Sequence, residues 1–371
     1  MATSPLHYCT RCVMDTTDED IHFDIQGNCN HCTDFITFLQ NHRYQPKISE
    51  QKWSLALQSI KERGKNKKYD CLVGISGGVD SSYTAHLCKE YGLRPLLMHF
   101  DNGWNTQEAK ENVKIMVDAL GFDFVDYKVD WEEFRQIQLA FLKSSIVDLE
   151  IPTDIGILGA NYEIAQKQDI PTIISGGNFS AEGILPLTWG YHVKNDMKLY
   201  KHIVKEYGNI RLKKVPTAGF LDNFYIKFIK GIKTYYPLNY IDFNKDIARQ
   251  FLIDTYGFKD YGGKHQESII TSFWQGYVMP TKYNMDLRKA TYSSQICSGQ
   301  LTREDALQKL ESPYYELEKA QQDKVLIAQK WGITEQELEK YLQLPPKTYK
   351  DFPNQKGFID FFYKLYFKLK R

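Results

Sequence analysis

Short apolar runs alternate with amphipathic segments through the middle of the 371-residue chain. The runs are rich in Val, Leu, Ile and Phe, which predicts buried strands, and the segments between them carry apolar residues at helical spacing. Strands that alternate with helices predict an α/β fold with a doubly wound parallel sheet. The expected strands are CLVGIS (71–76), RPLLMHF (94–100), FDFVDYKV (122–129) and PTIISGGN (171–178), and the expected helices cover 80–91, 106–120 and 154–168.

The pattern divides the chain into three regions. Strand signals end near residue 243, and helical signals dominate after it. We therefore expect an α/β domain over 51–243 and a helical substrate-binding region over 244–371. Residues 1–50 precede the alternating pattern and contain two closely spaced cysteine pairs, so we expect a separate metal-binding module there.

Charge and hydropathy narrow the class of protein. The chain has 47 basic residues (Lys and Arg) against 46 acidic ones (Asp and Glu), a balance that argues against an extended nucleic-acid footprint. Its apolar runs are too short to span a membrane, and its N-terminus lacks the apolar core of a signal peptide. We therefore expect a cytoplasmic protein that binds no nucleic acid.

Four cysteines form two C-x-x-C pairs, Cys9 with Cys12 and Cys29 with Cys32. Each pair places two thiolates on one tight turn, which is typical of a four-cysteine zinc site, and four protein ligands indicate a structural ion. An iron–sulfur cluster or four buried thiols are the alternatives. In a chain without an export signal, a metal site is favoured over disulfides.

The first strand leads into the string SGGVDSS at residues 76–82. Its glycines allow a ligand to approach the backbone, its serines supply hydroxyls, and the next helix adds its N-terminal amides. Asp80 is a suitable ligand for Mg²⁺. A glycine turn followed by a capped helix is the simpler alternative, but the complete string between a strand and a helix favours phosphate binding.

This string resembles the pyrophosphate-binding loop of the PP-loop ATPases, which split ATP into AMP and pyrophosphate. The resemblance implies that ATP and Mg²⁺ bind at this loop. Its nucleotide-binding residues would be Ser76, Gly77, Gly78, Asp80, Ser81 and Ser82 in the loop, His99 and Asp101 at the end of the second strand, and Gly176 and Asn178 after the fourth.

The stretch from residue 261 to 307 holds a second group of polar residues. Lys264, His265 and Glu267 cluster on a glycine turn that enters an apolar helix. A histidine shuttles protons near neutral pH, and a carboxylate there would steer ammonia or bind metal. The alternative for each residue is a role in starting the helix. Arg288 lies in a short charge run that is otherwise typical of a solvated surface.

Taken together, the C-x-x-C pairs, ISGGVDSS, ISGGN (174–178) and GGKHQES…DLRKA…SQICSGQLTREDAL resemble the N-acetyl sugar amidotransferases of surface-polysaccharide synthesis, the WbpG/PseA-like proteins. The resemblance implies conversion of a sugar acetamido group to an acetamidino group with ATP and ammonia. The implied substrate is a nucleotide-activated N-acetylated sugar for lipopolysaccharide or nonulosonic acid synthesis. Its catalytic residues would be Asp80, Lys264, His265, Glu267 and Arg288.

The source of ammonia points to partner proteins. A glutaminase needs a nucleophilic cysteine, either N-terminal or on an elbow. Here Ala2 follows Met1, and no second α/β unit is left over to house an elbow. We therefore expect separate glutaminase and cyclase-like subunits, as in imidazole glycerol phosphate synthase.

The sequence leaves several alternative functions and contacts open. A PP-loop tRNA thiolase is one alternative, although no paired catalytic cysteine follows the loop, and a non-catalytic nucleotide-binding scaffold is another. The basic stretches 198–214 and 227–233 are interpreted as a cradle for a sugar-nucleotide diphosphate or as solvated helix faces. The amphipathic tail 357–371 is expected to dock on the core, with peripheral membrane contact as its alternative.

Overall fold

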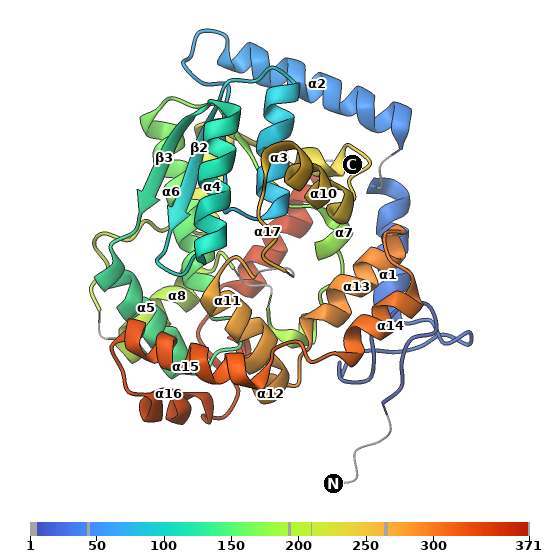
Figure 1. The fold of residues 1–371 in the computed structure, drawn as a ribbon, viewed down its shortest axis with the longest axis vertical. Coiled ribbons are helices and arrows are strands. Elements are labelled where there is room, and N and C mark those ends of the chain that lie inside the picture. Colours follow the sequence, from blue (N-terminus) through green and yellow to red (C-terminus); the bar gives the residue numbers. More distant parts are fainter. Residues whose placement is uncertain (1–5, 43–44, 192–193, 209, 263–265, 370–371) are drawn as a thin grey trace.

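A sheet of five parallel strands forms the centre of the computed structural model, which describes residues 6–42, 45–191, 194–208, 210–262 and 266–369 (Figure 1). The strand order is β3-β2-β1-β4-β5, so the direction of strand addition reverses at β1. The strands are β1 (Cys71–Gly74), β2 (Pro95–Asp101), β3 (Asp123–Lys128), β4 (Thr172–Ile174) and β5 (Lys233–Tyr235). The predicted α/β fold with a parallel sheet is confirmed.

Alternate side chains of the central strands enter two different cores. Cys71 and Val73 of β1 belong to one cluster of buried residues, whereas Leu72 between them belongs to the other. The same alternation separates Leu97 from Leu96 in β2. A central parallel strand is buried on both faces, which explains why the sequence runs there are continuously apolar.

Helices cover both faces of the sheet. The face that receives Val73 is covered by α2 (Pro46–Gly64), α3 (Val79–Glu90), α4 (Gln107–Leu120) and α10 (Lys245–Tyr256). The face that receives Leu72 is covered by α5 (Trp131–Ser144) and α6 (Ile151–Lys167). Helix α10 packs on α3, although the predicted boundary at 243/244 placed its residues in the C-terminal region. The three predicted domain ranges stay predictions.

The two edge strands differ from the central ones in their side chains. Strand β3 exposes Asp123, Asp126 and Lys128, as is usual for an edge that must not pair with another chain. Strand β5 was missed by the sequence analysis. It is only three residues long, and it begins at Lys233, the last residue of the predicted basic stretch 227–233.

Short helices connect the last strands. Between β4 and α10 the chain forms α7 (Phe179–Glu182), η1 (Leu187–Trp189), α8 (Met197–Ile203), η2 (Val204–Gly208), α9 (Phe220–Phe224), η3 (Tyr225–Ile229) and η4 (Pro237–Asn239). Of these, η2 and η3 are π-helical continuations of α8 and α9. The predicted basic stretch 198–214 therefore begins inside α8.

In Figure 1 the C-terminal helices up to α16 lie below the sheet and beside the N-terminal module, whereas α17 crosses the middle of the view. They are α11 (Ile269–Phe273), η5 (Trp274–Val278), α12 (Met279–Tyr283), α13 (Leu287–Ser298), α14 (Arg303–Glu311), α15 (Leu317–Trp331), α16 (Glu335–Leu342), η6 (Tyr349–Asp351) and α17 (Lys356–Leu369). Helix α1 (Asn30–His42) packs against α13, so the N-terminal module contacts the C-terminal region.

Membrane-spanning length is not reached by any helix in the described part of the chain, because none combines sufficient length with an apolar sequence.

Candidate active site and cysteine centre

The predicted nucleotide loop, residues 76–82, runs from the end of β1 into the first turn of α3, at the carboxyl edge of the sheet. Gly77 has a φ of +80°, and a Cβ there would stand 2.2 Å from the carbonyl oxygen of Ala109 in α4. The Ser81 hydroxyl accepts a hydrogen bond from the Ser76 amide at 3.1 Å and donates one to the Gly78 carbonyl at 3.1 Å. The loop is therefore held in shape by its own groups and by its close approach to α4.

Asp80 forms an ion pair that the sequence analysis did not anticipate. Its Oδ2 lies 2.9 Å from Nζ of Lys245, the first residue of α10, and both side chains are largely buried. The other carboxylate oxygen of Asp80 is buried and has no hydrogen-bond partner among the described residues. An unpartnered carboxylate oxygen beside a phosphate-type loop fits the predicted Mg²⁺ ligand.

Two other segments, one after β4 and one before α11, contact the loop. A Cβ on Gly176, after β4, would stand 3.0 Å from the carbonyl carbon and oxygen of Asp80, so the two backbones are in contact. The Val79 amide donates to the Tyr261 hydroxyl at 3.0 Å, and burial raises the pKa of Tyr261 well above its ordinary value. A carboxylate oxygen of Glu267 lies 3.6 Å from the position of a Cβ on Gly78.

The end of β2 is tied to the end of β1 through His99. Its Nδ1 donates to the Ile75 carbonyl at 2.8 Å, which makes Nε2 the acceptor for the Asn105 amide at 3.0 Å. Asp101 accepts a hydrogen bond from the Gly103 amide at 2.9 Å. His99 thus orients the strand ends, and its predicted contact with the nucleotide, like those of Asp101 and Asn178, stays a prediction.

The predicted catalytic residues divide into three groups. Asp80 and Glu267 lie at the nucleotide loop. Lys264 and His265 lie outside the described residues. Arg288 donates hydrogen bonds to the carboxylate of Asp286 and to the carbonyl oxygen of Ser312, and among the described residues it has no hydrogen bond to the loop.

A buried polar cluster on the connection between α5 and α6 is a second feature that the sequence analysis missed. Burial raises the pKa of Asp148 to about 7 and that of Glu150 to about 8. Each has one carboxylate oxygen without a hydrogen-bond partner among the described residues. Glu150 also accepts a hydrogen bond from the Thr271 hydroxyl at 3.1 Å, which connects the cluster to α11, three residues after its Ser268 N-cap.

Lys194 is the cation of this cluster. Its ammonium group lies 2.6 Å from Asp154 and 5.0 Å from the centre of the Tyr191 ring. Burial acts to lower the pKa of Lys194, but the charges of Asp154 and Asp148 raise it above its ordinary value. The Lys194 side chain keeps 41% of its surface accessible, so a ligand can reach it.

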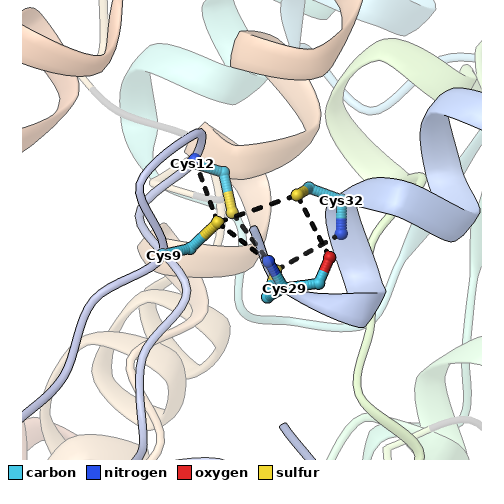
Figure 2. A group of neighbouring side chains, drawn as sticks. All are labelled: Cys9, Cys12, Cys29 and Cys32. Carbon is cyan, nitrogen blue, oxygen red and sulfur yellow. Dashed lines mark hydrogen bonds between the residues drawn. The ribbon is translucent and has the colours of Figure 1, made fainter. Parts of the chain in front are cut away.

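The four predicted metal ligands come together in one buried group (Figure 2). The sulfur atoms of Cys9 and Cys32 are 3.7 Å apart, those of Cys12 and Cys29 are 3.6 Å apart, and all four lie within 4.8 Å of one another. Sulfur atoms at about 2.3 Å from a tetrahedral zinc ion would be about 3.8 Å apart. The geometry therefore fits a structural zinc ion.

Backbone hydrogen bonds reach the sulfur atom of Cys9. The amides of Cys12 and Cys29 donate to the Cys9 sulfur at 3.4 and 3.2 Å. The Cys12 thiol, followed by the Cys29 thiol, lowers the pKa of Cys9 to about 6. The pKa of Cys29, in contrast, is raised by the neighbouring thiols of Cys12 and Cys32. Metal binding requires the thiolate form, so the surroundings favour the ligand state at Cys9 and oppose it at Cys29.

The cysteine centre is fastened to the C-terminal helices. Arg303 at the start of α14 donates to the carbonyl oxygens of Cys9 and Cys12 at 3.0–3.2 Å. Lys289 of α13 pairs with the buried Asp15 at 2.5 Å. The first metal-binding turn is therefore shaped by residues almost 300 positions away in sequence.

We expect purified protein to contain about one zinc ion per chain by metal analysis, because four thiolates complete a tetrahedral shell. Cys29→Ser should lose the ion and unfold at a lower temperature, since zinc binding contributes to folding. Cys88→Ala, which changes a buried cysteine of the other core, should keep its zinc. Iron with sulfide in place of zinc, or no metal, would contradict the assignment.

Lys245→Ala should weaken ATP binding about tenfold to a hundredfold, because a hydrogen bond to a charged group contributes about 1.5–3 kcal/mol. The substitution leaves Asp80 without its cation and removes a positive charge from the loop. Titration calorimetry measures the affinity. Lys259→Ala is the matched control, since Lys259 pairs instead with Glu111; equal affinities for both variants would remove Lys245 from the site.

Asp148→Asn should stabilise the protein at pH 8 more than at pH 5. An unfolded aspartate has a pKa of about 3.9, and the folded group has one of about 7. Between these values the folded state binds more protons, so wild-type stability falls as the pH rises. The asparagine variant does not lose this free energy of unfolding as the pH rises, and the difference is on the order of 2–4 kcal/mol.

Urea unfolding at the two pH values measures this difference. Asp34→Asn, at an exposed position, should change the stability equally at both pH values. A pH-independent effect of Asp148→Asn would contradict the buried, protonated carboxyl group.

Comparisons with known proteins place the C-terminal helices in a family. Residues 267–369 match the family described as "LPS biosynthesis protein WbpG-like, C-terminal domain". None of the curated proteins matches the sequence.

Solved structures show weaker likenesses. An NH3-dependent NAD synthetase from Campylobacter jejuni subsp. jejuni NCTC 11168 is 17% identical, with a TM-score of 0.31 over 72% of this chain and 96% of that one. An NMN synthetase from Francisella tularensis is 17% identical, with a TM-score of 0.29 over 60% and 99%. A predicted subunit of tRNA methyltransferase from Methanocaldococcus jannaschii DSM is 16% identical, with a TM-score of 0.30 over 49% and 74%.

Likenesses at these TM-scores add nothing to the fold, which the sheet topology defines. The family match begins at Glu267, the residue whose carboxylate lies beside the nucleotide loop. The family relationship predicted from the sequence is thus confirmed over residues 267–369, which are similar to the WbpG-like C-terminal domain.

Proposed function

We propose that this chain is an ATP-dependent, AMP-forming amidotransferase that converts the acetamido group of a nucleotide-activated sugar to an acetamidino group. One observation carries the proposal: the first residue of the WbpG-like domain, Glu267, lies against Gly78 of the SGGVDSS loop. A loop suited to pyrophosphate and a domain of a lipopolysaccharide-biosynthesis family therefore meet at one site. The substrate and the reaction are inferred from the family and from this chemistry.

ATP binds with its phosphates on residues 76–82. The backbone at Gly77 and Gly78 has no side chains to keep a phosphate away, and the N-terminus of α3 favours negative charge. Lys245 supplies a cation next to Asp80. Mg²⁺, held by Asp80, would offset the charge of the phosphate oxygens when it is bound.

The first step activates the amide. The acetamido oxygen attacks the α-phosphorus of ATP, an oxygen–phosphorus bond forms, and the bond to the β-phosphate breaks. Pyrophosphate leaves on the loop, whose positive helix end and Lys245 stabilise the departing charge. The sugar now carries an O-adenylated imidate, in which AMP replaces a poor leaving group.

In the second step ammonia attacks the imidate carbon, and the carbon–oxygen bond to AMP breaks to leave the amidine. The attacking ammonia must lose a proton. Glu267 is the carboxylate at the loop that we assign to this transfer, with His265 and Lys264 as the predicted helpers nearby in sequence. Arg288, whose described bonds join α13 to the end of α14, is assigned only to positioning.

The sugar nucleotide has a candidate binding region beside this site. Asn102, which follows β2, donates to Thr153 at the start of α6 at 3.5 Å, and Asp154 on the same turn pairs with Lys194. Both charged groups are partly accessible, and an ammonium group and a carboxylate suit a phosphate and sugar hydroxyls. We assign the pair of Asp154 and Lys194 to binding of the sugar nucleotide.

We also propose that separate glutaminase and cyclase-like subunits supply the ammonia, in a cytoplasmic reaction.

The test uses purified protein with ATP, Mg²⁺, ammonium chloride and a panel of nucleotide-activated N-acetylated sugars. We expect AMP by chromatography and replacement of one oxygen by NH in the sugar by mass spectrometry. Glu267→Gln should slow the formation of AMP and amidine, while Glu304→Gln, an exposed carboxylate on α14, should not. AMP formed only with tRNA and a sulfur donor would identify a thiolase instead, and no turnover with added ammonia would contradict an amidotransferase.

A further inference from the structure

An exposed apolar face is formed by two segments that are far apart in sequence, α9–η3 (220–229) and α17. Monomeric proteins rarely expose large apolar side chains in one contiguous group. Ile229 and Phe361 are 67% and 63% exposed. The exposed apolar residues of this aromatic face are Leu221, Phe224, Tyr225, Phe228, Ile229, Phe358, Phe361, Tyr363 and Leu365.

Ring contacts show that the two segments form one surface. Phe224 contacts Phe362 with ring centres 5.7 Å apart, and it contacts Phe228 at 4.6 Å. Phe362 in turn contacts Phe358 at 5.4 Å. Beneath them lies the buried Phe220, which contacts Phe358 and Phe362. The aromatic side chains therefore continue without a break from η3 to α17.

Lysines surround the aromatic face. Residues 219–236 and 356–365 contain five lysines and two aspartates. Asp360 is paired with Lys356 at 2.5 Å, and Asp222 accepts the Gly219 amide at 2.8 Å as a helix cap. The sequence adds Lys368, Lys370 and Arg371 beyond this segment. The face thus combines exposed aromatic residues with a net positive charge.

This composition selects one partner. Exposed Phe and Tyr beside Lys are typical of surfaces that insert into the headgroup region of a bilayer, where the rings contact lipid and the lysines contact anionic headgroups. The charge complements a negative surface, and the lack of a membrane-spanning helix in the described residues is compatible with binding from one side. We propose that the aromatic face binds the surface of an anionic lipid bilayer.

The aromatic face lies on the side of the molecule near the predicted nucleotide loop. Strand β5 follows η3 directly, and the ring of Tyr236 after β5 lies 3.3 Å from the position of a Cβ on Gly177. Gly177 is the neighbour of Gly176, whose backbone contacts Asp80. A bilayer bound at this face would therefore lie near the β4–β5 side of the candidate active site. The proposal does not depend on the reaction that this site performs.

Cosedimentation of the full chain with vesicles tests the proposal. We expect the protein to bind phosphatidylcholine vesicles that contain phosphatidylglycerol, and to bind pure phosphatidylcholine vesicles at least tenfold more weakly at the same salt concentration, because the anionic surface attracts the lysines. The double variant Ile229→Ser/Phe361→Ser should lose at least tenfold in binding to the anionic vesicles. Lys230→Glu/Lys364→Glu should show a loss that depends on salt.

Matched controls separate this face from other apolar residues. Leu317 and Ile247 are as exposed as Ile229 and Phe361 but lie on other helices, so Leu317→Ser/Ile247→Ser should bind vesicles as the wild type does. ATP affinity and thermal unfolding check that each variant is folded. Equal loss in the controls, or no binding of wild type to anionic vesicles, would overturn the proposal. A concentration-dependent dimer in light scattering that Ile229→Ser/Phe361→Ser abolishes, without vesicle binding, would assign the face to self-association instead.

Discussion

The packing of Gly77 against the first turn of α4 is the contact on which the predicted nucleotide site, at the carboxyl edge of the sheet, depends. The Cβ of any side chain at position 77 would stand 2.2 Å from the carbonyl oxygen of Ala109. That oxygen belongs to the backbone of α4, so it cannot move away as the end of a flexible side chain can. The same helix contributes Asn112, whose amide group bonds to the Gly77 carbonyl and to the backbone of Lys259. This contact couples the loop to α4 and to the segment that leads into the WbpG-like domain.

The C-terminal helices complete two separate sites. At the nucleotide edge, Tyr261 and Glu267 reach the start of α3 from the segment that precedes α11. At the other end, α13 and α14 hold the metal-binding turn through Lys289 and Arg303. A zinc ion at the cysteine centre would therefore stabilise α13 and α14 as well as its own turns. We interpret the centre as a cross-link between the N-terminal module and helices α13 and α14.

Local sequence predicted the parts of the fold that depend on local chemistry. The β1 run, its glycine turn and the four thiols are each contiguous patterns, and the structure places them as expected. Strand β5 was missed because three residues carry no periodicity, and its pairing with β4 comes from tertiary packing. The only sign in the sequence that β3 lies at the edge of the sheet is its charged residues. A strand pattern by itself does not distinguish an edge strand from a central one.

The candidate site was predicted less completely, because many of its contacts join distant residues. Lys245 lies 165 positions from Asp80, and in sequence it is only the first residue of a capped helix. Asp148 and Glu150 are charged residues in a short connection, where burial is not expected from composition. Arg288 bonds to the end of α14, and its predicted catalytic role stays a prediction. The sequence shows which residue types are present and how they are spaced, but which of them are buried or paired can be seen only in the fold.

The central claim is that the sugar amide is activated by adenylation on the 76–82 loop. Its most direct test labels the acetamido oxygen of the sugar substrate with heavy oxygen and follows the label by mass spectrometry of the products. If the amide oxygen attacks the α-phosphorus, the label appears in AMP and is absent from pyrophosphate and from the amidine. Unlabelled AMP, or label found in ADP or inorganic phosphate, would contradict adenylation and the role proposed for this loop.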